Sequence, residues 1–334
     1  MKAILMTARG SADEVLAQSD VPEPRLAHGH EILVRIQAAG VNPVDAKQRV
    51  RGPYKSGEMP VILGCDAAGV VEEAGTDCER FAPGDAVYFC SGGIGDAPGT
   101  YAEYTVVDER YCARKPDSLS FVEAAAAPLV LLTAWESLFE RARTASGHRV
   151  LIHAGAGGVG HVAIQLAREG GARVATTVGS PEKAALATEL GAEAPILYKT
   201  TDFAAAARDW TGGTGVDVAL DVLGGETFTR TFAAMRPYGE LITVLQPPPD
   251  TDWAEARLRN LRIGLELMLS PMYYGMHGER MRQAAILERC GALFDAGRLR
   301  VVVSDTFPLA EAARAHRAIE TGSTTGKLVL VFND

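Results

Sequence analysis

The chain has 334 residues, 47% of them hydrophobic, which is typical of a globular protein with a substantial core and predicts about two domains. The formal net charge of -9 at pH 7, without any basic run, argues against a nucleic-acid surface, and no apolar stretch is long enough to span a membrane. Five scattered cysteines, an odd number, favour reduced thiols in a cytoplasm over a disulfide framework.

The first 125 residues contain short apolar runs separated by turn residues, such as Pro83-Gly84-Asp85. Strands are expected over residues 32–38, 61–74, 86–90 and 101–107. Short strands at this spacing predict an antiparallel, barrel-like domain.

From Phe121 onward the pattern changes to alternating helices and strands. Alternation of this kind predicts a parallel, doubly wound sheet with helices on both faces. The expected strands cover 149–153, 172–178, 216–221 and 240–245, and the expected helices 122–127, 133–143, 161–168, 181–190 and 228–236.

After about residue 270 the chain is expected to return to the first domain, with a helix over 279–296, a strand over 299–304, a helix over 310–320 and a last strand over 326–332. The predicted domains are therefore 1–125 with 270–334, and 126–269.

The segment Arg149–Gly160 carries the strongest functional signal. Its last residues form a G-x-G-x-x-G pattern between a strand and a helix, made of Gly155, Gly157, Gly158, Val159 and Gly160. The first glycine permits a tight turn, the second lets the backbone approach a pyrophosphate, and the third lets the helix pack on the strand. The pattern predicts dinucleotide binding, and the alternative is a turn of the same fold that has lost its ligand.

The end of the second strand indicates which dinucleotide binds. An NAD site usually has an acid about 20 residues beyond the glycines, but Gly179 and Ser180 stand at that place. Ser180 and Lys183 can both bind a phosphate, and one charge-assisted hydrogen bond contributes about 1.5–3 kcal/mol. The segment favours NADPH over NADH. Alternatively, Lys183 is a solvated residue of a helix that Ser180 caps and Pro181 begins.

Two later strands end in residues that suit the same crevice, because ligands of doubly wound sheets bind at the carboxyl ends of the strands. The strand over 216–221 runs into Val222 and Gly224, and the strand over 240–245 ends at Leu245. These three residues are predicted cofactor contacts.

Several segments together resemble the medium-chain dehydrogenase/reductase superfamily along essentially the whole chain. They are Ala39–Asp45, Pro60–Gly75, Gly99–Tyr104, Leu132–Trp135 and His153–Gly160. The chain looks most like the zinc-free quinone oxidoreductase (zeta-crystallin-like) branch. The resemblance implies an α/β protein with a GroES-like β-barrel catalytic domain and a Rossmann domain, and a homodimer.

The resemblance also bears on zinc. Zinc alcohol dehydrogenases have a Cys where this chain has Asn42, and a His-Glu pair where it has Cys65 and Asp66, and their third ligand has no counterpart near residues 124–128. A catalytic zinc needs three protein ligands, so no metal is expected. Cys65 is expected to be a small buried hydrophobe, or alternatively a reactive thiol.

By resemblance, Asn42 and Tyr54 lie near the nicotinamide, where an amide or phenol can donate to a carbonyl that gains negative charge. The alternatives are an Asn-Pro turn for Asn42 and loop packing for Tyr54. Asp45 either orients Asn42 or starts a helix. Thr133 matches a position on the nicotinamide side, and otherwise caps the helix after it.

Two more positions follow from the resemblance. Tyr198 matches a tyrosine beside the adenosine 2′-phosphate, with core packing as the alternative. Lys327 lies where the last strand of the family passes the cofactor, with a surface lysine as the alternative.

These features predict a zinc-independent, NADPH-dependent reductase of a quinone or an α,β-unsaturated carbonyl compound, with a small hydrophobic substrate. A second reading is an alcohol or aldehyde dehydrogenase that retains a poor metal site at Cys65 and Asp66. A third is an NADPH-binding protein without turnover.

Overall fold

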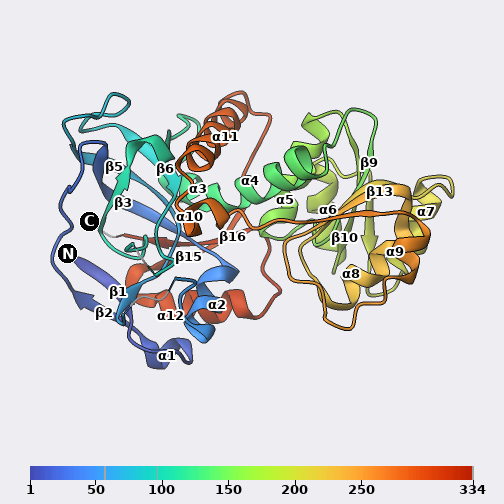
Figure 1. Ribbon diagram of the computed structural model, residues 1–334, viewed down its shortest axis with the longest axis horizontal. Coiled ribbons are helices and arrows are strands. Elements are labelled where there is room, and N and C mark those ends of the chain that lie inside the picture. Colours follow the sequence, from blue (N-terminus) through green and yellow to red (C-terminus); the bar gives the residue numbers. More distant parts are fainter. Residues whose placement is uncertain (56–57, 96, 333–334) are drawn as a thin grey trace. The chain divides into compact units, whose positions relative to one another are not determined.

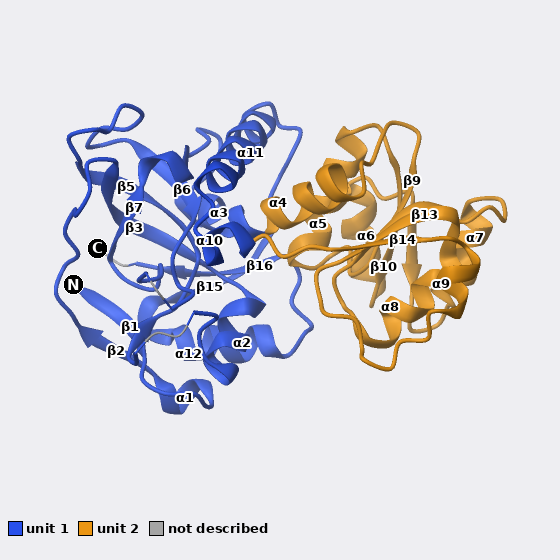
Figure 2. Ribbon diagram, in the orientation of Figure 1, with its two compact units in different colours: residues 1–129, 269–334 blue, residues 130–268 orange. Residues whose placement is uncertain are grey.

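The computed structural model describes residues 1–55, 58–95 and 97–332. The chain divides into two compact units (Figures 1 and 2). Unit 1 contains Met1–Leu129 and Leu269–Asp334, and unit 2 contains Val130–Met268. Among the described residues, none of the helices has the length and apolar character needed to cross a membrane.

Unit 1 is built on a largely antiparallel sheet whose strands follow the order β15-β16-β3-β5-β6-β8, with β7 also paired to β3. Along β3 the side chains of Ile32, Val34 and Ile36 are buried in alternation, as expected of a strand with one face on the core. The strands are β3 (Glu31–Val41), β5 (Asp66–Ala74), β6 (Ala86–Cys90), β7 (Tyr104–Asp108), β8 (Cys112–Arg114), β15 (Val303–Pro308) and β16 (Lys327–Val331).

A second, smaller sheet of unit 1 has the order β2-β1-β4, and the described residues of this unit also form six α-helices. The strands are β1 (Lys2–Met6), β2 (Leu16–Asp20) and β4 (Val61–Ile62). The helices are α1 (Ala12–Val15), α2 (Pro43–Arg51), α3 (Phe121–Ala126), α10 (Ser270–Tyr273), α11 (His277–Asp295) and α12 (Ala312–Glu320).

Unit 2 contains a six-stranded parallel sheet in the order β11-β10-β9-β12-β13-β14. This order reverses direction between β9 and β12, which is the switch point where doubly wound sheets bind ligands. The strands are β9 (Arg149–Ile152), β10 (Arg173–Val178), β11 (Ala194–Leu197), β12 (Val216–Asp221), β13 (Met235–Thr243) and β14 (Arg262–Leu265).

Helices cover both faces of this sheet (Figure 1). On one face α7, α8 and α9 share a hydrophobic cluster with the strands, whereas α5 packs on β9 and β10. The helices are α4 (Pro128–Trp135), α5 (Gly158–Glu169), α6 (Pro181–Glu189), α7 (Phe203–Trp210), α8 (Gly225–Thr231) and α9 (Ala254–Leu258). The predicted fold class, a barrel-like domain with a doubly wound parallel domain, is confirmed.

Some element boundaries differ from the prediction. The single strand expected over 61–74 is two strands, because Gly64 between them has φ +93° and turns the chain. The strand expected over 299–304 runs instead over Val303–Pro308, where it pairs with β16. The helix expected over 228–236 ends at Thr231, because Met235 already pairs with Val216 at the start of β13.

Candidate functional site

The glycine turn of unit 2 joins β9 to α5. A Cβ on Gly155 would lie 2.1 Å from Thr176 Oγ1, and one on Gly160 would lie 2.2 Å from the carbonyl oxygen of Ala154. Both glycines are therefore needed by the fold itself. A Cβ on Gly157 would meet only atoms of Ala154, the nearest at 3.1 Å, so this backbone is open on its other side.

The same turn presents backbone donors at the start of α5. The first helical hydrogen bond runs from His161 N to Gly157 O at 3.1 Å. The N–H groups of Gly158, Val159 and Gly160 precede it and, like those of any first helical turn, are directed out of the helix end. A helix start of this kind binds an anionic group such as a pyrophosphate.

The end of β10 carries no acid. Ser180 Oγ accepts a hydrogen bond from Lys183 N at 3.3 Å, so Ser180 caps α6. A Cβ on Gly179 would lie 3.3 Å from Tyr198 Oη and 3.7 Å from Lys199 Cε. Gly179, Tyr198 and Lys199 thus lie side by side. Tyr198 is 50% exposed, so the alternative of core packing for it is wrong.

Lys199 was not found from the sequence, although a basic residue directly after Tyr198 is a usable signal. Together with Lys183 it gives the end of β10 two cationic side chains and no carboxylate at positions 178–180. The carboxylate of Glu182, two residues further on, lies close to this place, because a hydrogen bond with the Ser180 side chain lowers its pKa.

The ends of β12 and β13 are organised around Asp221. Its buried carboxylate accepts hydrogen bonds from Leu223 N at 3.0 Å, Gly224 N at 2.9 Å and Thr243 Oγ1 at 2.8 Å. Gly224 has φ +68°, and a Cβ there would lie 3.0 Å from Leu245 Cδ1. Asp221 therefore shapes the loop that contains Val222, Gly224 and Leu245. The sequence signal that could have identified Asp221 is an acidic residue at the end of a buried strand.

Two further polar side chains of unit 2, His153 and Thr133, are buried. His153 is hydrogen-bonded to Thr177 Oγ1 at 3.1 Å and Thr231 Oγ1 at 2.9 Å, and burial lowers its pKa to about 4, so the ring is neutral. Thr133 lies inside α4, which begins at Pro128. The alternative role of Thr133 as a helix cap is therefore wrong.

Unit 1 buries a polar group that we call the Asn42 cluster: Asn42, Asp45, Asp66, Tyr101 and Lys327. Lys327 Nζ donates to Asn42 Oδ1 and lies 3.7 Å from Asp66 Oδ2, and Asn42 Nδ2 donates to Asp66 Oδ2 at 2.9 Å. Asp45 accepts from Asn42 N at 2.9 Å and from Tyr101 Oη at 3.0 Å. The orientation of the Asn42 amide is thereby fixed from both ends.

The cluster joins four parts of the chain, one of which is the segment before β7 that contributes Tyr101. Asn42 and Asp45 form the capping box that starts α2, Asp66 begins β5, and Lys327 begins β16. Both roles proposed for Asp45, orienting Asn42 and starting a helix, thus occur together. Lys327 is 3% exposed, so the alternative of a surface lysine is wrong.

Burial determines the electrostatics of the cluster. Desolvation raises the pKa of Asp45 to about 7, although its hydrogen bonds from Asn42 and Tyr101 oppose the shift. Burial also raises the pKa of Asp66 and lowers that of Lys327, and the charge of each partner offsets part of the other's shift. The attraction between the lysine ammonium and the Asp66 carboxylate favours the charged form of each, against the effect of burial.

Tyr54 does not take part in these hydrogen bonds. Its side chain is 44% exposed, and its backbone N–H donates to Gln48 Oε1 at 3.2 Å. It lies just before residues 56–57, which are outside the described part of the chain. The structure thus gives Tyr54 an accessible phenol on the loop after α2.

Cys65 and Asp66, which stand where zinc alcohol dehydrogenases have zinc ligands, are poorly placed to hold a metal ion. Among the described residues, no three His, Cys, Asp or Glu side chains are grouped closely enough to hold a metal ion. Asp66 accepts from Leu129 N at 2.8 Å as well as from Asn42, and a lysine ammonium stands beside it. Cys65 is buried; a hydrogen bond with Cys90 lowers its pKa, but burial and nearby acids leave that pKa raised.

Comparison with known proteins places this architecture in a family. Residues 28–117 match the family model of the alcohol dehydrogenase GroES-like domain, and residues 190–330 match that of the zinc-binding dehydrogenase. A quinone oxidoreductase of Pseudomonas aeruginosa is 32% identical over 99% of both chains. A 2-haloacrylate reductase of Burkholderia sp. is 34% identical over 90% of both chains.

Solved structures agree. The crystal structure of Escherichia coli quinone oxidoreductase complexed with NADPH is 27% identical, covers 99% of this chain and 100% of its own, and superposes with a TM-score of 0.87. The chain therefore belongs to the medium-chain dehydrogenase/reductase superfamily and, within it, to the quinone oxidoreductase branch.

Proposed function

We propose that the chain is a metal-independent reductase that uses NADPH to reduce a quinone or an α,β-unsaturated carbonyl compound. The observation that carries this proposal is the glycine turn, where Gly155 and Gly160 are required by packing while Gly157 leaves the backbone open for a pyrophosphate. The relatives named above are called reductases or oxidoreductases, and the Escherichia coli structure holds NADPH.

The residues at the end of β10 favour NADPH over NADH. Gly179 leaves space beside Tyr198 and Lys199, and positions 178–180 hold no acid where a ribose hydroxyl is usually bound. We assign the 2′-phosphate to Ser180, Lys183, Tyr198 and Lys199. The pyrophosphate is assigned to Gly157, Gly158, Val159 and Gly160, and the ribose and nicotinamide side to Thr133, Val222, Gly224 and Leu245.

When bound, the reduced nicotinamide supplies a hydride to the β-carbon of an enone, while a proton from water completes the reduction at the α-carbon. The protein contributes hydrogen-bond donors for the substrate and a charged group that strengthens one of them. Asn42 Nδ2 donates one of its two hydrogens to Asp66. We assign the second hydrogen to the carbonyl oxygen of the substrate. Lys327, on the amide oxygen, withdraws electron density and strengthens that donor. Tyr54 is a second donor to the substrate, and Asp45 and Lys327 are positioning residues.

The two alternative functions, an alcohol dehydrogenase and a binding protein without turnover, would require different features of the site. An alcohol dehydrogenase with a metal at Cys65 and Asp66 would need a cation next to the Lys327 ammonium, which like-charge repulsion opposes. A binding protein without turnover would have the same dinucleotide cradle and would reduce nothing.

The deciding experiment follows NADPH oxidation by chelator-treated protein with a quinone, an enone and an aldehyde in parallel. Quinone or enone reduction that survives chelation supports the proposal. Reduction of the aldehyde alone, restored by added zinc, would contradict it, and tight NADPH binding without oxidation across a broad acceptor panel would favour the binding protein.

Asn42→Ala should lower kcat more than it raises KM, because the lost hydrogen bond acts on the developing charge.

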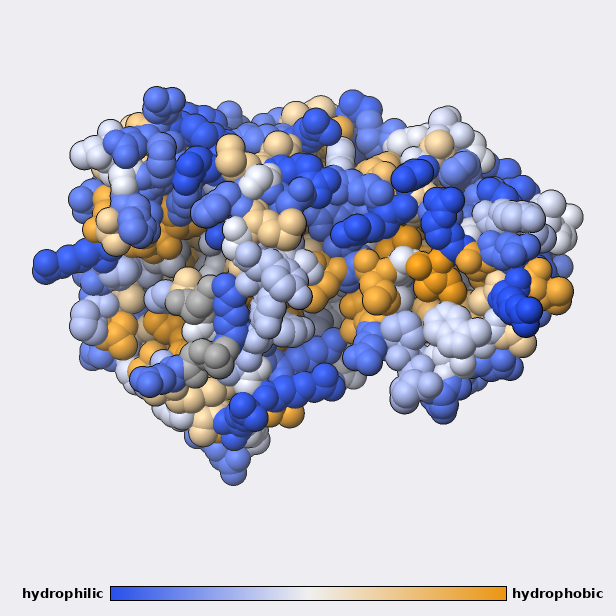
Figure 3. All heavy atoms as spheres, viewed as in Figure 1, coloured by the Kyte–Doolittle hydropathy of each residue, from blue (hydrophilic) through white to orange (hydrophobic). Residues whose placement is uncertain are grey.

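We also propose that the protein is a homodimer joined along β14, an edge strand of the unit 2 sheet. Leu265 is 62% exposed and Leu267 47% exposed beside this edge, and Figure 3 shows hydrophobic side chains at the surface over unit 2. A strand edge flanked by apolar side chains pairs readily with another chain. Light scattering should give twice the mass of one chain, and Leu265→Glu should give a monomer.

A further inference from the structure

Helices α2 and α12 carry three enclosed polar atoms that have no hydrogen-bond partner within the described part of the chain. They are Asp45 Oδ1, Arg49 Nε and His316 Nδ1. The three residues are at most 2% exposed. Buried polar atoms are nearly always hydrogen-bonded, either to protein or to ordered water. Three such atoms in two helices that pack together therefore require an explanation.

The three side chains are neighbours. Asp45 and Arg49 lie four residues apart and therefore on the same face of α2. Asp45 Oδ2 and His316 Nε2 both lie at Tyr101 Oη, at 3.0 and 3.3 Å. Burial, followed by the positive charge of Arg49, lowers the pKa of His316, so Arg49 lies near that ring. The unpaired atoms thus lie around one place where α12 packs on α2.

The hydrogen on the His316 ring can be assigned from the partners of the ring. Tyr101 has a single hydroxyl hydrogen, which it donates to Asp45. Tyr101 Oη must therefore accept from His316 Nε2, which places the ring hydrogen on that nitrogen. Burial lowers the pKa of His316 to about 3, so the ring is neutral. His316 Nδ1 is consequently an acceptor without a hydrogen.

Asp45 contributes a donor when it is protonated. Its Oδ2 already accepts hydrogen bonds from Asn42 N at 2.9 Å and from Tyr101 Oη at 3.0 Å. A proton on this carboxyl therefore belongs on Oδ1. Because burial raises the pKa of Asp45 to about 7, Oδ1 carries that proton at lower pH.

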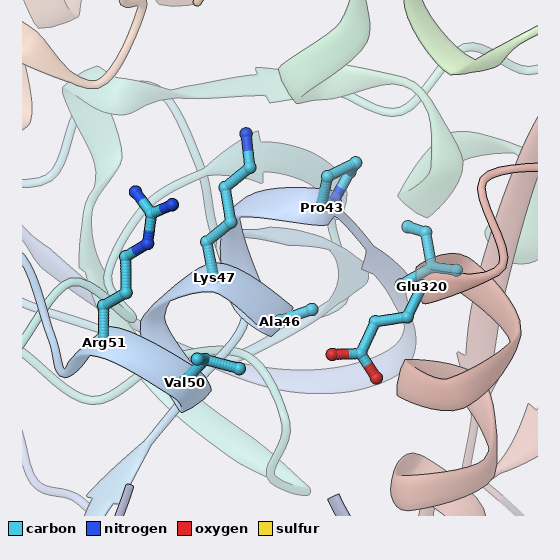
Figure 4. A pocket seen from close by; sticks show the side chains of 7 residues that line it. Pro43, Ala46, Lys47, Val50, Arg51 and Glu320 are labelled. Atoms are coloured by element: carbon cyan, nitrogen blue, oxygen red, sulfur yellow. The ribbon is translucent and has the colours of Figure 1, made fainter. Parts of the chain in front are cut away.

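Arg49 contributes a second donor. Its terminal nitrogens donate to Gly10 O and to the Glu320 carboxylate, so the Nε hydrogen remains. Solvent reaches the outer side of this ion pair. Glu320 lines a pocket of about 260 Å³ beside α2 (Figure 4), and with Arg49 it lines a neighbouring pocket of about 410 Å³. Water can therefore come close to the Arg49 side chain without crossing the core.

Two donors and one acceptor complement a water molecule, because a buried water typically makes about three hydrogen bonds. We propose that α2 and α12 enclose an internal water that accepts from Asp45 Oδ1 and Arg49 Nε and donates to His316 Nδ1. When Asp45 releases its proton, the same water can turn and donate its second hydrogen to Oδ1. The site therefore remains satisfied in both charge states of Asp45.

The water gives His316 a role in the reaction. Asp45 accepts from Asn42 N, and Tyr101 and the water hold its two carboxyl oxygens. His316 is bonded to both Tyr101 and the water, so it is a positioning residue that acts on Asn42 through Asp45. This role rests on the reductase function proposed above, whereas the water site does not.

The direct test is a crystal structure of the wild type at a resolution that shows ordered water. We expect a density peak within hydrogen-bond distance of Asp45 Oδ1, Arg49 Nε and His316 Nδ1. A direct hydrogen bond between Arg49 Nε and Asp45 Oδ1, or no peak beside these atoms, would overturn the water site. The measurement needs no variant, so it stands even if a substitution prevents folding.

The positioning role is tested with His316→Leu and His316→Gln. Leucine removes both bonding atoms of the ring, whereas the glutamine amide retains a donor and an acceptor. In His316→Leu we expect kcat with a quinone or an enone to fall about tenfold, because Asn42 loses its position, while KM and NADPH affinity change little. His316→Gln should recover most of this loss.

His28→Leu is the matched control, because His28 is exposed and it is its backbone N–H that donates to Glu31 Oε2. This variant should keep the wild-type kcat. An unchanged kcat in His316→Leu, or an equal loss in His316→Gln, would overturn the positioning role. If the wild type reduces neither quinone nor enone but the density peak is found, the reductase function fails and the water site stands.

Discussion

The ammonium of Lys327 lies 3.7 Å from the carboxylate of Asp66, and both side chains are almost completely buried. The pair connects the first residue of β16 with the first residue of β5. Each charge is balanced by the other, and the Asn42 amide forms a hydrogen bond with both side chains. A buried charge that loses its partner is strongly destabilising, whereas the loss of both charges costs less.

Lys327→Met should therefore destabilise unit 1 by about 3–5 kcal/mol, because Asp66 would remain buried without its partner. Asp66→Asn combined with Lys327→Met should cost less than the sum of the two single changes. Urea denaturation of the three variants gives this coupling directly. Strict additivity would show that the pair does not interact energetically.

Asp45 should make stability depend on pH. Burial raises the pKa of its carboxyl from 3.8 to about 7, with Asp66, Lys327 and Tyr101 as the charged or titratable groups facing it. Between those two values the folded protein holds a proton that the unfolded chain has released, so stability falls as the pH rises through this window. The slope has an upper limit of about 1.4 kcal/mol per pH unit.

Asp45→Asn mimics the protonated side chain and removes this titration. The variant should match the wild type near pH 4 and be the more stable of the two at pH 8. Urea denaturation at several pH values compares them, and parallel pH profiles would exclude Asp45 as the cause.

The glycine turn and the helix cap show what local pattern could predict. Gly155 and Gly160 were interpretable because neither position has room for a Cβ, whereas Gly157 was interpretable by its place between them in the motif. Ser180 was assigned both as a phosphate ligand and as a cap, and the structure confirms the cap. These features depend on residues close together in the sequence.

The Asn42 cluster could not be assembled in the same way. Lys327 is 285 residues from Asn42, and only the antiparallel pairing of β16 with β3 brings them together. From the sequence, Lys327 was predicted to be a cofactor contact or a surface lysine, and no partner was predicted for Asp66. Asp221 was missed for a related reason, because its acceptor role depends on Thr243 from the neighbouring strand.

Two substitutions in the glycine turn should separate folding from binding. Gly160→Ala places a Cβ 2.2 Å from a backbone carbonyl and should cost about 1–3 kcal/mol of stability. Gly157→Ala has a nearest contact of 3.1 Å and should stay within about 1 kcal/mol of the wild type. NADPH affinity, measured by fluorescence titration, should nevertheless fall at least tenfold in Gly157→Ala. Full affinity in this variant would mean that the pyrophosphate does not approach Gly157.

The choice between NADPH and NADH can be tested at Ser180 without disturbing α6. Aspartate caps a helix about as well as serine, so Ser180→Asp should preserve the cap that now accepts from Lys183 N. The new carboxylate would repel a 2′-phosphate, and it could accept a hydrogen bond from a ribose hydroxyl instead. We expect kcat/KM for NADPH to fall about tenfold to a hundredfold while that for NADH is retained or rises. Ser180→Asn, an uncharged cap, is the control and should keep the preference for NADPH. An equal loss with both cofactors in Ser180→Asp would indicate a damaged helix and would leave no support for a phosphate at this strand end.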